Sequence, residues 1–441
     1  MSSTKSLIDI GIQEFIRFLR NEDISRFYFV YNPVEKKVIS SHHQLQPLAD
    51  FFQSDKRDFM EHEGMFFQVT NEHNTLQGAF VHRTCRGQAA GGVRYWHYDT
   101  VEAFMRDGMR LGKGMTRKNA LAGLWWGGGK GVMARNPEIA SDDPDIRASV
   151  YTEYGEFISS LRGCYVTAED VGTCVKDMER VFSRTRFTTC IPESWGGSGN
   201  PSEPTARGVV SGMEAALDYL GMGGLSGKTV AVQGMGNVGG PLIEFLFEKD
   251  VARVVACDIN PKFVEKLWDQ LRNENLDARI VEKDDISILS EPVDIFSPNA
   301  TGAVLNPQTI PLLKARIVCG AANNQLEDPQ RDDQALMDMG LLYVPDFLAN
   351  RMGIVNAANE QYGYVNNDPL FERHLNREWK HSIWQTTLRV LHESREKKVP
   401  TAKIAMRLAD VLAKDKHPIF GHRGLLIIQS LVEDAWHEQV R

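Results

Sequence analysis

The chain has 441 residues, of which 42% are hydrophobic and 24% are charged, and its formal net charge is −8. At roughly 150 residues per domain, this length predicts two or three globular domains with ordinary apolar cores. Acidic and basic residues alternate along the chain, which argues against a nucleic-acid partner. No apolar run approaches the ~18 residues of a membrane span, and no signal-peptide core is present, so we expect a cytoplasmic protein without a membrane partner.

Strands and helices are mixed in the first two hundred residues. The glycine cluster at 127–129 predicts a tight turn that leads into a strand over 131–134. The hydrophobic periodicity predicts five further elements, which are strands over 65–70 and 77–82, helices over 100–113 and 144–162, and a strand over 164–170.

The pattern changes near residue 200, where the segment 196–204 is rich in Gly, Ser and Pro and is typical of a hinge. Strands and helices then alternate, which predicts a parallel, doubly wound sheet. The expected elements are helices over 205–220, 237–248 and 261–273, and strands over 229–233, 254–258, 294–297, 316–320 and 342–345. The predicted fold is therefore α/β with an N-terminal domain over 1–200, a Rossmann-like domain over 201–365 and C-terminal helices over 366–441 that return to the first domain.

A glycine-rich motif joins a predicted strand to a predicted helix. The segment Gly234-Met-Gly236-Asn237-Val238-Gly239 fits G-x-G-x-x-G, in which the glycines allow a tight turn, close approach of a pyrophosphate and close helix–strand packing. We expect the helix that begins at Asn237 to offer its N–H groups to that anion. The next strand ends in Asp258, whose carboxylate would accept hydrogen bonds from a ribose and repel a 2′-phosphate. The motif therefore predicts NAD rather than NADP.

Lys118 and Lys130 flank a segment of small residues that ends in a triple glycine. A single lysine is usually a solvated surface charge. Glycines beside Lys130, however, indicate that backbone and ligand come close there, and a neighbouring ammonium would lower the pKa of this lysine. Lys130 is therefore a candidate general base.

The chain resembles the glutamate/leucine/phenylalanine/valine dehydrogenase family, most closely its leucine dehydrogenase branch, from about residue 75 to 365. Its motifs occur here in order, as Gly91-Gly92-Val93-Arg94, Gly127-Gly-Gly-Lys130, Thr167-Ala168-Glu169-Asp170, Thr205-x-x-Gly208 and Gly320-Ala-Ala-Asn323-Asn324.

The resemblance implies a role for each matching residue. Lys118 would bind the substrate α-carboxylate, Lys130 would activate the attacking water, and Asp170 would exchange a proton with the substrate nitrogen. Thr205 and Asn324 would lie beside the nicotinamide and its ribose. The implied reaction is NAD-dependent oxidative deamination of an L-amino acid to a 2-oxo acid and ammonia, which is reversible. The family also implies a substrate-binding and oligomerisation role for the first domain, and hence a homo-oligomer.

The substrate side chain is expected to meet an apolar wall. Gly92 and Ala168 are predicted to face the cleft, since Ala168 lies two residues before Asp170 on the expected strand. Glutamate enzymes carry a lysine where this chain has Ala90 and a serine where it has Ala357, which lies one helical turn after Ile354. Leucine enzymes carry larger aliphatic residues at both positions, so we expect an apolar substrate, bulky or aromatic. Glutamate dehydrogenase and a catalytically silent NAD-binding scaffold are the alternatives.

Several features are left open by the motifs. Arg351 and Met352 replace small residues, and Trp125 and Trp126 precede the triple glycine; these side chains either fill the core or line the pocket. The aromatic segment over 27–31 is expected to serve packing or subunit contact. None of the six cysteines occurs in a C-x-x-C pair or at metal-ligand spacing from a histidine, so no metal site is predicted.

Overall fold

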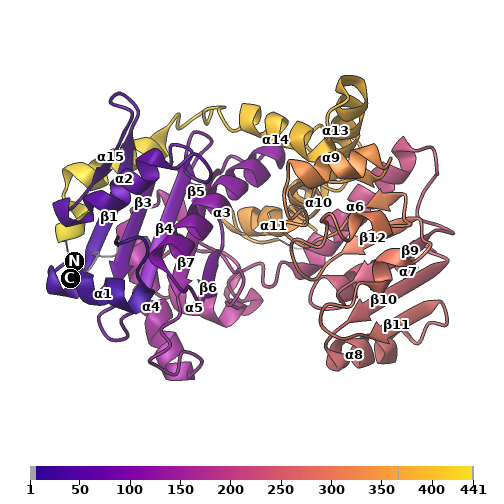
Figure 1. The fold of residues 1–441 in the computed structure, drawn as a ribbon, viewed down its shortest axis with the longest axis horizontal. Helices are drawn as coiled ribbons and strands as arrows, with labels where there is room; N and C mark the ends of the chain where they lie inside the picture. Colours follow the sequence, from indigo (N-terminus) through magenta and orange to yellow (C-terminus); the bar gives the residue numbers. More distant parts are fainter. Residues whose placement is uncertain (1–5, 366, 440–441) are drawn as a thin grey trace.

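The computed structural model describes residues 6–365 and 367–439, which form two lobes that are each built around one β-sheet (Figure 1). Helices pack on both sheets, so the predicted two-domain α/β fold is confirmed. The boundaries at residues 200 and 365 remain predictions. No helix within the described ranges is both long and apolar enough to cross a membrane.

The first lobe contains a mixed sheet in the order β2-β1-β3-β4-β7-β5-β8, with β6 paired to β7. The pairs from β2 to β7 are antiparallel, whereas β7 pairs in parallel with β5 and β6. The strands predicted over 65–70 and 77–82 are present as β3, which is displaced by one residue, and β4, which is one residue longer at each end. The strand bounds are β1 Arg26–Asn32, β2 Lys37–Ser40, β3 Gly64–Val69, β4 Leu76–Arg83, β5 Ala89–Ala90, β6 Val93–Trp96, β7 Gly127–Ala134 and β8 Tyr165–Val166.

The N-terminal segment covers the outer edge of this sheet with α1 (Ile12–Asn21), β1, β2 and α2 (Gln46–Ser54). α1 is amphipathic, and its buried residues recur at helical spacing; they are Ile12, Phe15, Ile16 and Leu19. Phe27 and Phe29 of β1 are fully buried, and the ring of Phe27 stacks 4.8 Å from that of Phe67. The aromatic segment therefore packs within the chain, which is one of the two roles expected for it.

The triple glycine does not form the predicted turn, because all three residues lie inside β7. A side chain is excluded there: a Cβ on Gly128 would lie 2.1 Å from the backbone nitrogen of Thr116 in α3 (Val101–Leu121). β7 therefore passes directly beneath that helix. Thr100, the first residue of the predicted helix, caps α3, and its hydroxyl accepts a hydrogen bond from the Ala103 N–H. It continues well beyond the predicted end at 113, since packing on β4 and β7 outweighs the low helix propensity of its glycines.

The rest of the first lobe is α4 (Pro144–Ser160) and α5 (Val175–Phe182), which pack together. Asp143 caps α4 by accepting hydrogen bonds from two backbone N–H groups, and Pro144 occupies the first turn, where no donor is lost. The strand predicted over 164–170 ends at Val166. Only an isolated bridge from Thr167 to Thr188 extends it, so Asp170 lies in the following loop.

The second lobe contains a six-stranded sheet in the order β11-β10-β9-β12-β13-β14, and all its pairs are parallel. This is the strand order of the doubly wound dinucleotide-binding fold. The predicted strand over 229–233 has the predicted bounds, whereas β11 was not predicted. The strands are β9 Thr229–Gln233, β10 Arg253–Asp258, β11 Leu276–Ile280, β12 Ile295–Pro298, β13 Ile317–Val318 and β14 Leu342–Tyr343.

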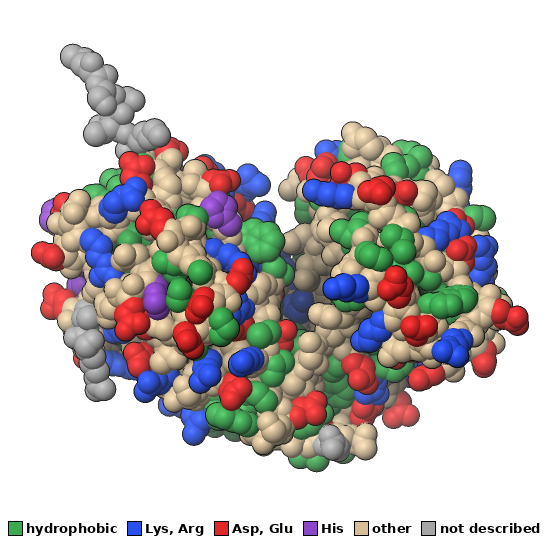
Figure 2. Space-filling model, turned by 90° about the horizontal axis from the view of Figure 1, so that it is seen from below, with side chains coloured by type: hydrophobic (Ala, Val, Ile, Leu, Met, Phe, Trp, Pro, Cys, Tyr) green, Lys and Arg blue, Asp and Glu red, His purple; other side chains and the backbone are tan. Residues whose placement is uncertain are grey.

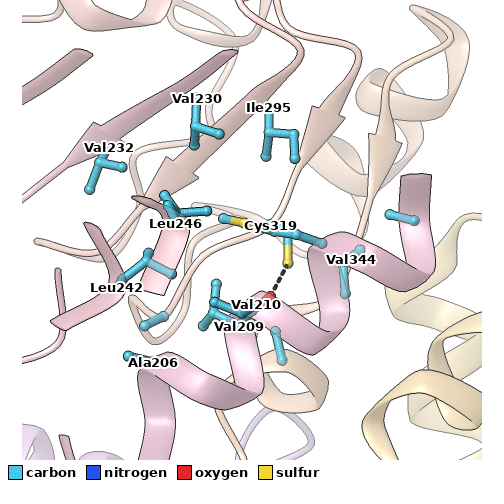
Figure 3. Close-up of a cluster of buried hydrophobic side chains, with 14 of the residues drawn as sticks. Ala206, Val209, Val210, Val230, Val232, Leu242, Leu246, Ile295, Cys319 and Val344 are labelled. Carbon is cyan, nitrogen blue, oxygen red and sulfur yellow. Dashed lines mark hydrogen bonds between the residues drawn. The ribbon is translucent and has the colours of Figure 1, made fainter. Parts of the chain in front are cut away.

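The central strands of this sheet are apolar on both faces, because helices cover each side. Figure 3 shows Val230, Val232 and Ile295 of the sheet facing Leu242 and Leu246 of α7, with Val209 and Val210 of α6 nearby. The helices of this lobe are α6 Ser202–Tyr219, α7 Gly239–Glu248, α8 Pro261–Leu271, α9 Arg331–Asp338, α10 Asp346–Ala349 and α11 Met352–Glu360.

The helices after α11 divide between the two lobes. α13 (Ile383–Lys397) packs chiefly against α6 of the second lobe, whereas α14 (Thr401–Leu412) packs against α3 of the first. α15 (Arg423–Glu433) lies at the outer end of the first sheet, beside β1 and β3 (Figure 1). The predicted return to the first domain thus describes α14 and α15 but not α13. The short α12 (Pro369–Glu372) contacts α11.

Candidate active site

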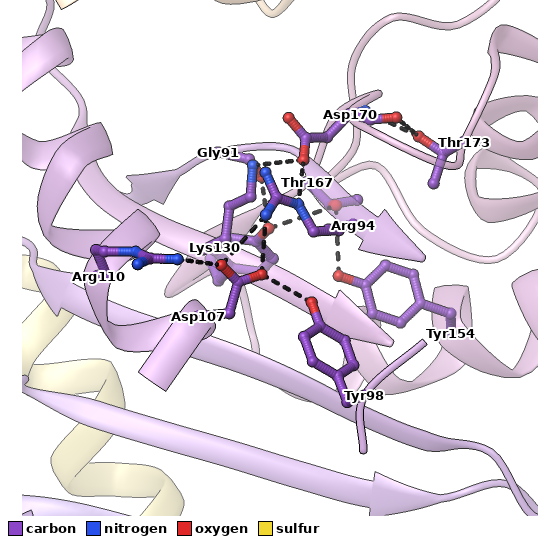
Figure 4. A network of polar contacts seen from close by, with 11 residues as sticks. Gly91, Arg94, Tyr98, Asp107, Arg110, Lys130, Tyr154, Thr167, Asp170 and Thr173 are labelled. Carbon is purple, nitrogen blue, oxygen red and sulfur yellow. Dashed lines mark hydrogen bonds and ion pairs between the residues drawn. The ribbon is translucent and has the colours of Figure 1, made fainter. Parts of the chain in front are cut away.

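Lys130 and Asp170 form a buried ion pair at the centre of the first lobe (Figure 4). The Lys130 ammonium lies 2.8 Å from the Asp170 carboxylate, and only 4% of the lysine side chain and 19% of the aspartate side chain are exposed. Lys130 projects from β7, and Asp170 follows β8. Gly92 makes their approach possible, since a Cβ there would lie 2.8 Å from the Cβ of Asp170. The structure therefore brings together the two residues predicted to be catalytic.

Burial and charge shift the pKa of both groups. Burial lowers the pKa of Lys130, and the Arg94 guanidinium lowers it further, while the Asp170 carboxylate opposes both effects. Burial alone would raise the pKa of Asp170, but Lys130 and Arg94 hold it below its usual range. The sequence predicted the downward shift in the pKa of Lys130 and attributed it to a neighbouring ammonium. The principal cause is burial, and Arg94 is the main neighbouring cation.

Arg94 is a polar neighbour of this pair to which sequence reasoning gave no role. Its guanidinium lies 3.4 Å from Asp170 and 3.0 Å from Asp107 of α3. The Tyr98 hydroxyl donates a hydrogen bond to Asp107 at 2.7 Å, and Arg110 pairs with the same carboxylate at 3.0 Å. This network fixes the position of Arg94 against Asp170. The Gly91-Gly92-Val93-Arg94 motif was a signal for the arginine, but nothing local indicated Asp107.

Lys118 lies near the end of α3, where the first lobe faces the second. Burial lowers the pKa of Lys118 to about 8; the Lys130 ammonium contributes to this shift, while Asp346 and Asp170 oppose it. Asp346 begins α10 in the second lobe and accepts a hydrogen bond from the backbone N–H of Asn324. The sequence did not identify Asp346. Its charge acts on Lys118, the lysine predicted to bind the substrate carboxylate, and it accepts a hydrogen bond from Asn324, which is predicted to lie beside the nicotinamide ribose.

Asn324 has a left-handed backbone conformation, with φ 54°. Asparagine tolerates this region better than most residues, and such strain concentrates at ligand-binding positions. Its carbonyl accepts a hydrogen bond from the Ala303 N–H at 2.8 Å, so both ends of its peptide unit are held. Asn324 is exposed to solvent.

The four residues predicted to surround the substrate side chain belong to one buried apolar cluster; they are Ala90, Ala168, Ile354 and Ala357. Ala90 ends β5, Ala168 follows β8, and the other two lie on α11. Ala90 and Ala357 are each 1% exposed. Met115 and Leu124 pack against the same cluster. The role of the four residues around the substrate side chain remains a prediction.

Arg351 and Met352 point away from this cluster. Arg351 is fully buried and donates to the carbonyl oxygen of Leu121 at 2.9 Å and to that of His381. The Arg351 guanidinium therefore pairs with a backbone carbonyl group at the C-terminal end of α3. Met352 is also fully buried and belongs to the core that contains α6. Neither fills the space beside the two alanines.

The two tryptophans have separate positions. Trp126 is buried in the apolar cluster, and its indole N–H donates to Gln361 at 2.6 Å. Trp125 is 41% exposed, and the Arg86 guanidinium lies 4.4 Å from the centre of its ring. Trp126 therefore fills the core, and Trp125 forms a cation–π contact at the surface.

The glycine-rich loop has the geometry of a pyrophosphate site. Gly234 has φ 93°, and a Cβ on Gly239 would lie 1.9 Å from the Gly234 carbonyl oxygen, which explains the first and third glycines. At Gly236 the nearest atom to an added Cβ is 3.7 Å away, so the backbone there is open to a ligand. Asn237 and Val238 form a turn, and α7 begins at Gly239 rather than at the predicted Asn237.

Asp258 ends β10 beside this loop, as predicted. Its carboxylate accepts hydrogen bonds from the backbone N–H groups of Met235 at 2.7 Å and Asn260 at 2.8 Å. Thr205, in the first turns of α6, lies against the start of α11, where a Cβ on Gly353 would be 2.8 Å from the threonine hydroxyl. The loop, Asp258 and Thr205 thus fit a bound dinucleotide.

A deep groove separates the two lobes (Figure 2). Lys118, Lys130 and Asp170 belong to the first lobe, and the glycine-rich loop and Asn324 belong to the second. A nucleotide-binding lobe opposite a buried lysine–aspartate pair is the architecture of a two-domain dehydrogenase.

Comparison with known proteins identifies the family. Residues 196–415 match the family described as Glutamate/Leucine/Phenylalanine/Valine dehydrogenase, and residues 65–187 match the Glu/Leu/Phe/Val dehydrogenase dimerisation domain. The chain therefore belongs to the Glu/Leu/Phe/Val dehydrogenase family, in its leucine dehydrogenase branch, and is an amino acid dehydrogenase.

Three relatives illustrate the range of this family. The leucine dehydrogenase of Bacillus subtilis (strain 168) is 42% identical over 331 residues, which are 75% of this chain and 85% of the relative. The valine dehydrogenase of Streptomyces albus is 39% identical over 75% of this chain and 86% of the relative. The L-tryptophan dehydrogenase of Nostoc punctiforme is 37% identical over 80% of this chain and 93% of the relative. Its crystal structure has a TM-score of 0.65 at 34% identity, covering 80% of this chain and 96% of that chain.

Proposed function

We propose that the protein catalyses the reversible, NAD-dependent oxidative deamination of an L-amino acid with an apolar side chain, bulky or aromatic ones included. The observation that carries this proposal is the buried Lys130–Asp170 pair, with Lys118 close enough for its pKa to respond to both groups. Two amines and one carboxyl group suit an amino acid: an ammonium binds the α-carboxylate, and a carboxylate accepts a proton from the α-amine.

Proton transfer links the two residues of the pair. In the resting pair the Asp170 carboxylate raises the pKa of Lys130 and thereby keeps the ammonium charged. When Asp170 takes a proton from the substrate amine, that stabilisation is lost and the pKa of Lys130 falls. Lys130 then releases its own proton to solvent and, as the free amine, takes a proton from the water that adds to the imino acid. Asp170 returns its proton to the nitrogen, and ammonia leaves as the new hydroxyl group loses its proton to solvent and the 2-oxo acid forms. The bound dinucleotide supplies the acceptor for the hydride from the α-carbon.

The second lobe supports NAD as the cofactor. The open backbone at Gly236 accommodates a pyrophosphate, and the Asp258 carboxylate is placed for ribose hydroxyls but repels a 2′-phosphate. Replacing Asp258 with Ser should weaken NAD binding by about tenfold, the loss of a hydrogen bond to a charged group. Asp277→Asn, on the neighbouring β11, should leave it unchanged. An unaltered NAD affinity in Asp258→Ser would refute the cofactor assignment.

The pocket favours an apolar substrate over glutamate. Ala90 and Ala357 place no cation opposite a γ-carboxylate. Glu169, next to Asp170, offers no cation either; burial, together with Asp177 and Asp170, raises the pKa of Glu169 to about 7. The test is NADH consumption with ammonia over a panel of 2-oxo acids: 4-methyl-2-oxopentanoate, phenylpyruvate, indolepyruvate and 2-oxoglutarate. We expect the lowest kcat/KM with 2-oxoglutarate. A highest value with 2-oxoglutarate would favour the glutamate dehydrogenase alternative, and NADH binding without turnover would favour the silent scaffold.

Pocket size has its own test. Ala357→Leu should lower kcat/KM for the aromatic 2-oxo acids by at least about 10–200-fold relative to the smaller aliphatic ones, the range for a single methylene group in an apolar pocket. An equal loss for all substrates would mean that Ala357 does not line the pocket.

We also propose that the chain forms a homo-oligomer through its first lobe. The match of residues 65–187 to the dimerisation domain supports this assembly. Sedimentation of the purified protein tests it, and a monomer at micromolar concentration would contradict it. A cytoplasmic location remains a prediction of the sequence.

A further inference from the structure

We propose that Glu63, Cys85 and His422 form a binding site for a divalent transition-metal cation of the zinc class. One ligand atom from each residue lies within 4.8 Å of the other two. A carboxylate, a thiolate and an imidazole are donors that Zn²⁺ prefers, and the two anionic donors balance its charge. The site shares no residue with the reacting centre, so it is independent of the proposed catalytic function.

The fold brings these three positions together from distant parts of the chain. Glu63 immediately precedes β3, and Cys85 follows the end of β4 by two residues. Because β3 and β4 are antiparallel, with Gly64 opposite Val81, the start of one strand lies beside the end of the other. His422 is the residue directly before α15, and its segment is held there by a hydrogen bond from the His417 N–H to the Cys85 carbonyl at 2.9 Å.

The Glu63 carboxylate is already oriented. Its side chain is 6% exposed, and one oxygen accepts a hydrogen bond from the Thr84 hydroxyl at 2.5 Å. The other oxygen lies 3.1 Å from Nε2 of His422. Thr84 in turn contacts the start of α15, since a Cβ on Gly424 would lie 2.3 Å from the Thr84 Cβ. Such supporting hydrogen bonds orient the ligands of metal sites.

Cation binding would displace the protons of the ligands, the Cys85 thiol proton among them. Ligand atoms on a tetrahedral zinc ion lie about 3.3–3.8 Å apart, so the widest separation has to close by about 1 Å. Cys85 and His422 are both partly exposed, which leaves room for this closure and for a water ligand.

A bound cation would fasten α15 to the sheet of the first lobe. α15 already packs there, with Ile428 beside Gly64, and the ring of Trp436 after the helix lies 5.3 Å from that of Phe66. The expected role of the cation is therefore structural. No sequence motif indicated this site, because no two of the three ligands have the short spacing of a metal-binding motif.

Titration of the full-length protein with Co²⁺ tests the proposal, since Co²⁺ reports thiolate ligation by a charge-transfer absorption band. We expect the band to saturate at one cobalt per chain and to disappear on addition of Zn²⁺. Cys85→Ser should abolish the band, and His422→Gln should weaken Co²⁺ binding at least tenfold. Cys174→Ser is the matched control, because Cys174 is exposed and lies elsewhere; it should leave the band unchanged.

Two results would overturn the proposal. One is the absence of a thiolate band at a several-fold excess of Co²⁺, which would leave Glu63 and His422 as an ion pair alone. The other is a band that persists in His422→Gln with unchanged affinity. Neither result depends on amino acid turnover, and His422→Gln alone decides the question if Cys85→Ser fails to fold.

Discussion

The Asp170→Asn variant isolates the energy of the central ion pair. Removing one partner of a buried pair costs about 3–5 kcal/mol when the other charge stays buried and unpaired. The asparagine amide keeps an oxygen acceptor at the position 2.8 Å from the Lys130 ammonium. When Lys130 loses its proton, the cost of burying an unpaired charge disappears. We therefore expect a loss of about 1–3 kcal/mol in the free energy of unfolding at pH 7.

The pH dependence of that loss has a definite sign. Asp170 raises the pKa of Lys130, so its removal leaves burial to lower that pKa further. A lysine whose pKa is lower in the folded state binds fewer protons there than when unfolded, so stability rises with pH, by up to about 1.4 kcal/mol per pH unit. The wild-type Asp170 carboxylate has a lowered pKa and is ionised throughout this range. The deficit of Asp170→Asn should therefore shrink between pH 7 and pH 9.

Urea unfolding of both proteins at pH 7, 8 and 9 measures this deficit. Asp142→Asn is the matched control, since Asp142 pairs with Arg135 at 3.1 Å but its side chain is 78% exposed. We expect that control to change stability by less than about 1 kcal/mol. A deficit below about 0.5 kcal/mol in Asp170→Asn, or one that stays constant from pH 7 to pH 9, would refute the reasoning.

Three further predictions concern other parts of the molecule. Lys118 has a pKa of about 8 and binds the α-carboxylate when protonated, so kcat/KM for the 2-oxo acid should fall as pH rises through 8; a flat profile from pH 7 to 9 would contradict that role. Arg351→Met should lower the free energy of unfolding in urea by about 2–4 kcal/mol, because it leaves the Leu121 carbonyl unpaired; an unchanged free energy would show that water replaces the guanidinium. Phe29→Ala should cost about 3–5 kcal/mol by the same measurement, and a loss under 1 kcal/mol would mean that the N-terminal aromatic cluster is loosely packed.

The sequence predicted the second lobe better than the first. The strand over 229–233, the turn at Gly234 and the carboxylate at Asp258 all follow from short-range patterns. In the first lobe the triple glycine was assigned to a turn, because glycine is most often a turn residue. It lies in β7 because α3 presses on that strand, and no local pattern reports such packing.

The candidate site shows the same difference between residues found by short-range patterns and residues placed by long-range contacts. Motifs identified Lys118, Lys130 and Asp170, since each lies in a recognisable stretch of sequence. They did not identify Asp107 or Asp346, which act through contacts made by distant segments. Isolated carboxylates of this kind are common on surfaces, so only three-dimensional proximity distinguishes them.

The most direct test of the central claim is single-turnover kinetics of Lys130→Met, which removes the ammonium and keeps most of the side-chain volume. The buried pair predicts a rate at least 10²–10⁴-fold below that of the wild type, the usual contribution of a general base, with NAD affinity within about threefold. Lys113→Met, a lysine on α3 outside the pair, should retain the wild-type rate. A Lys130→Met rate within tenfold of the wild type would contradict the assignment of Lys130 as the base and with it the proposed mechanism.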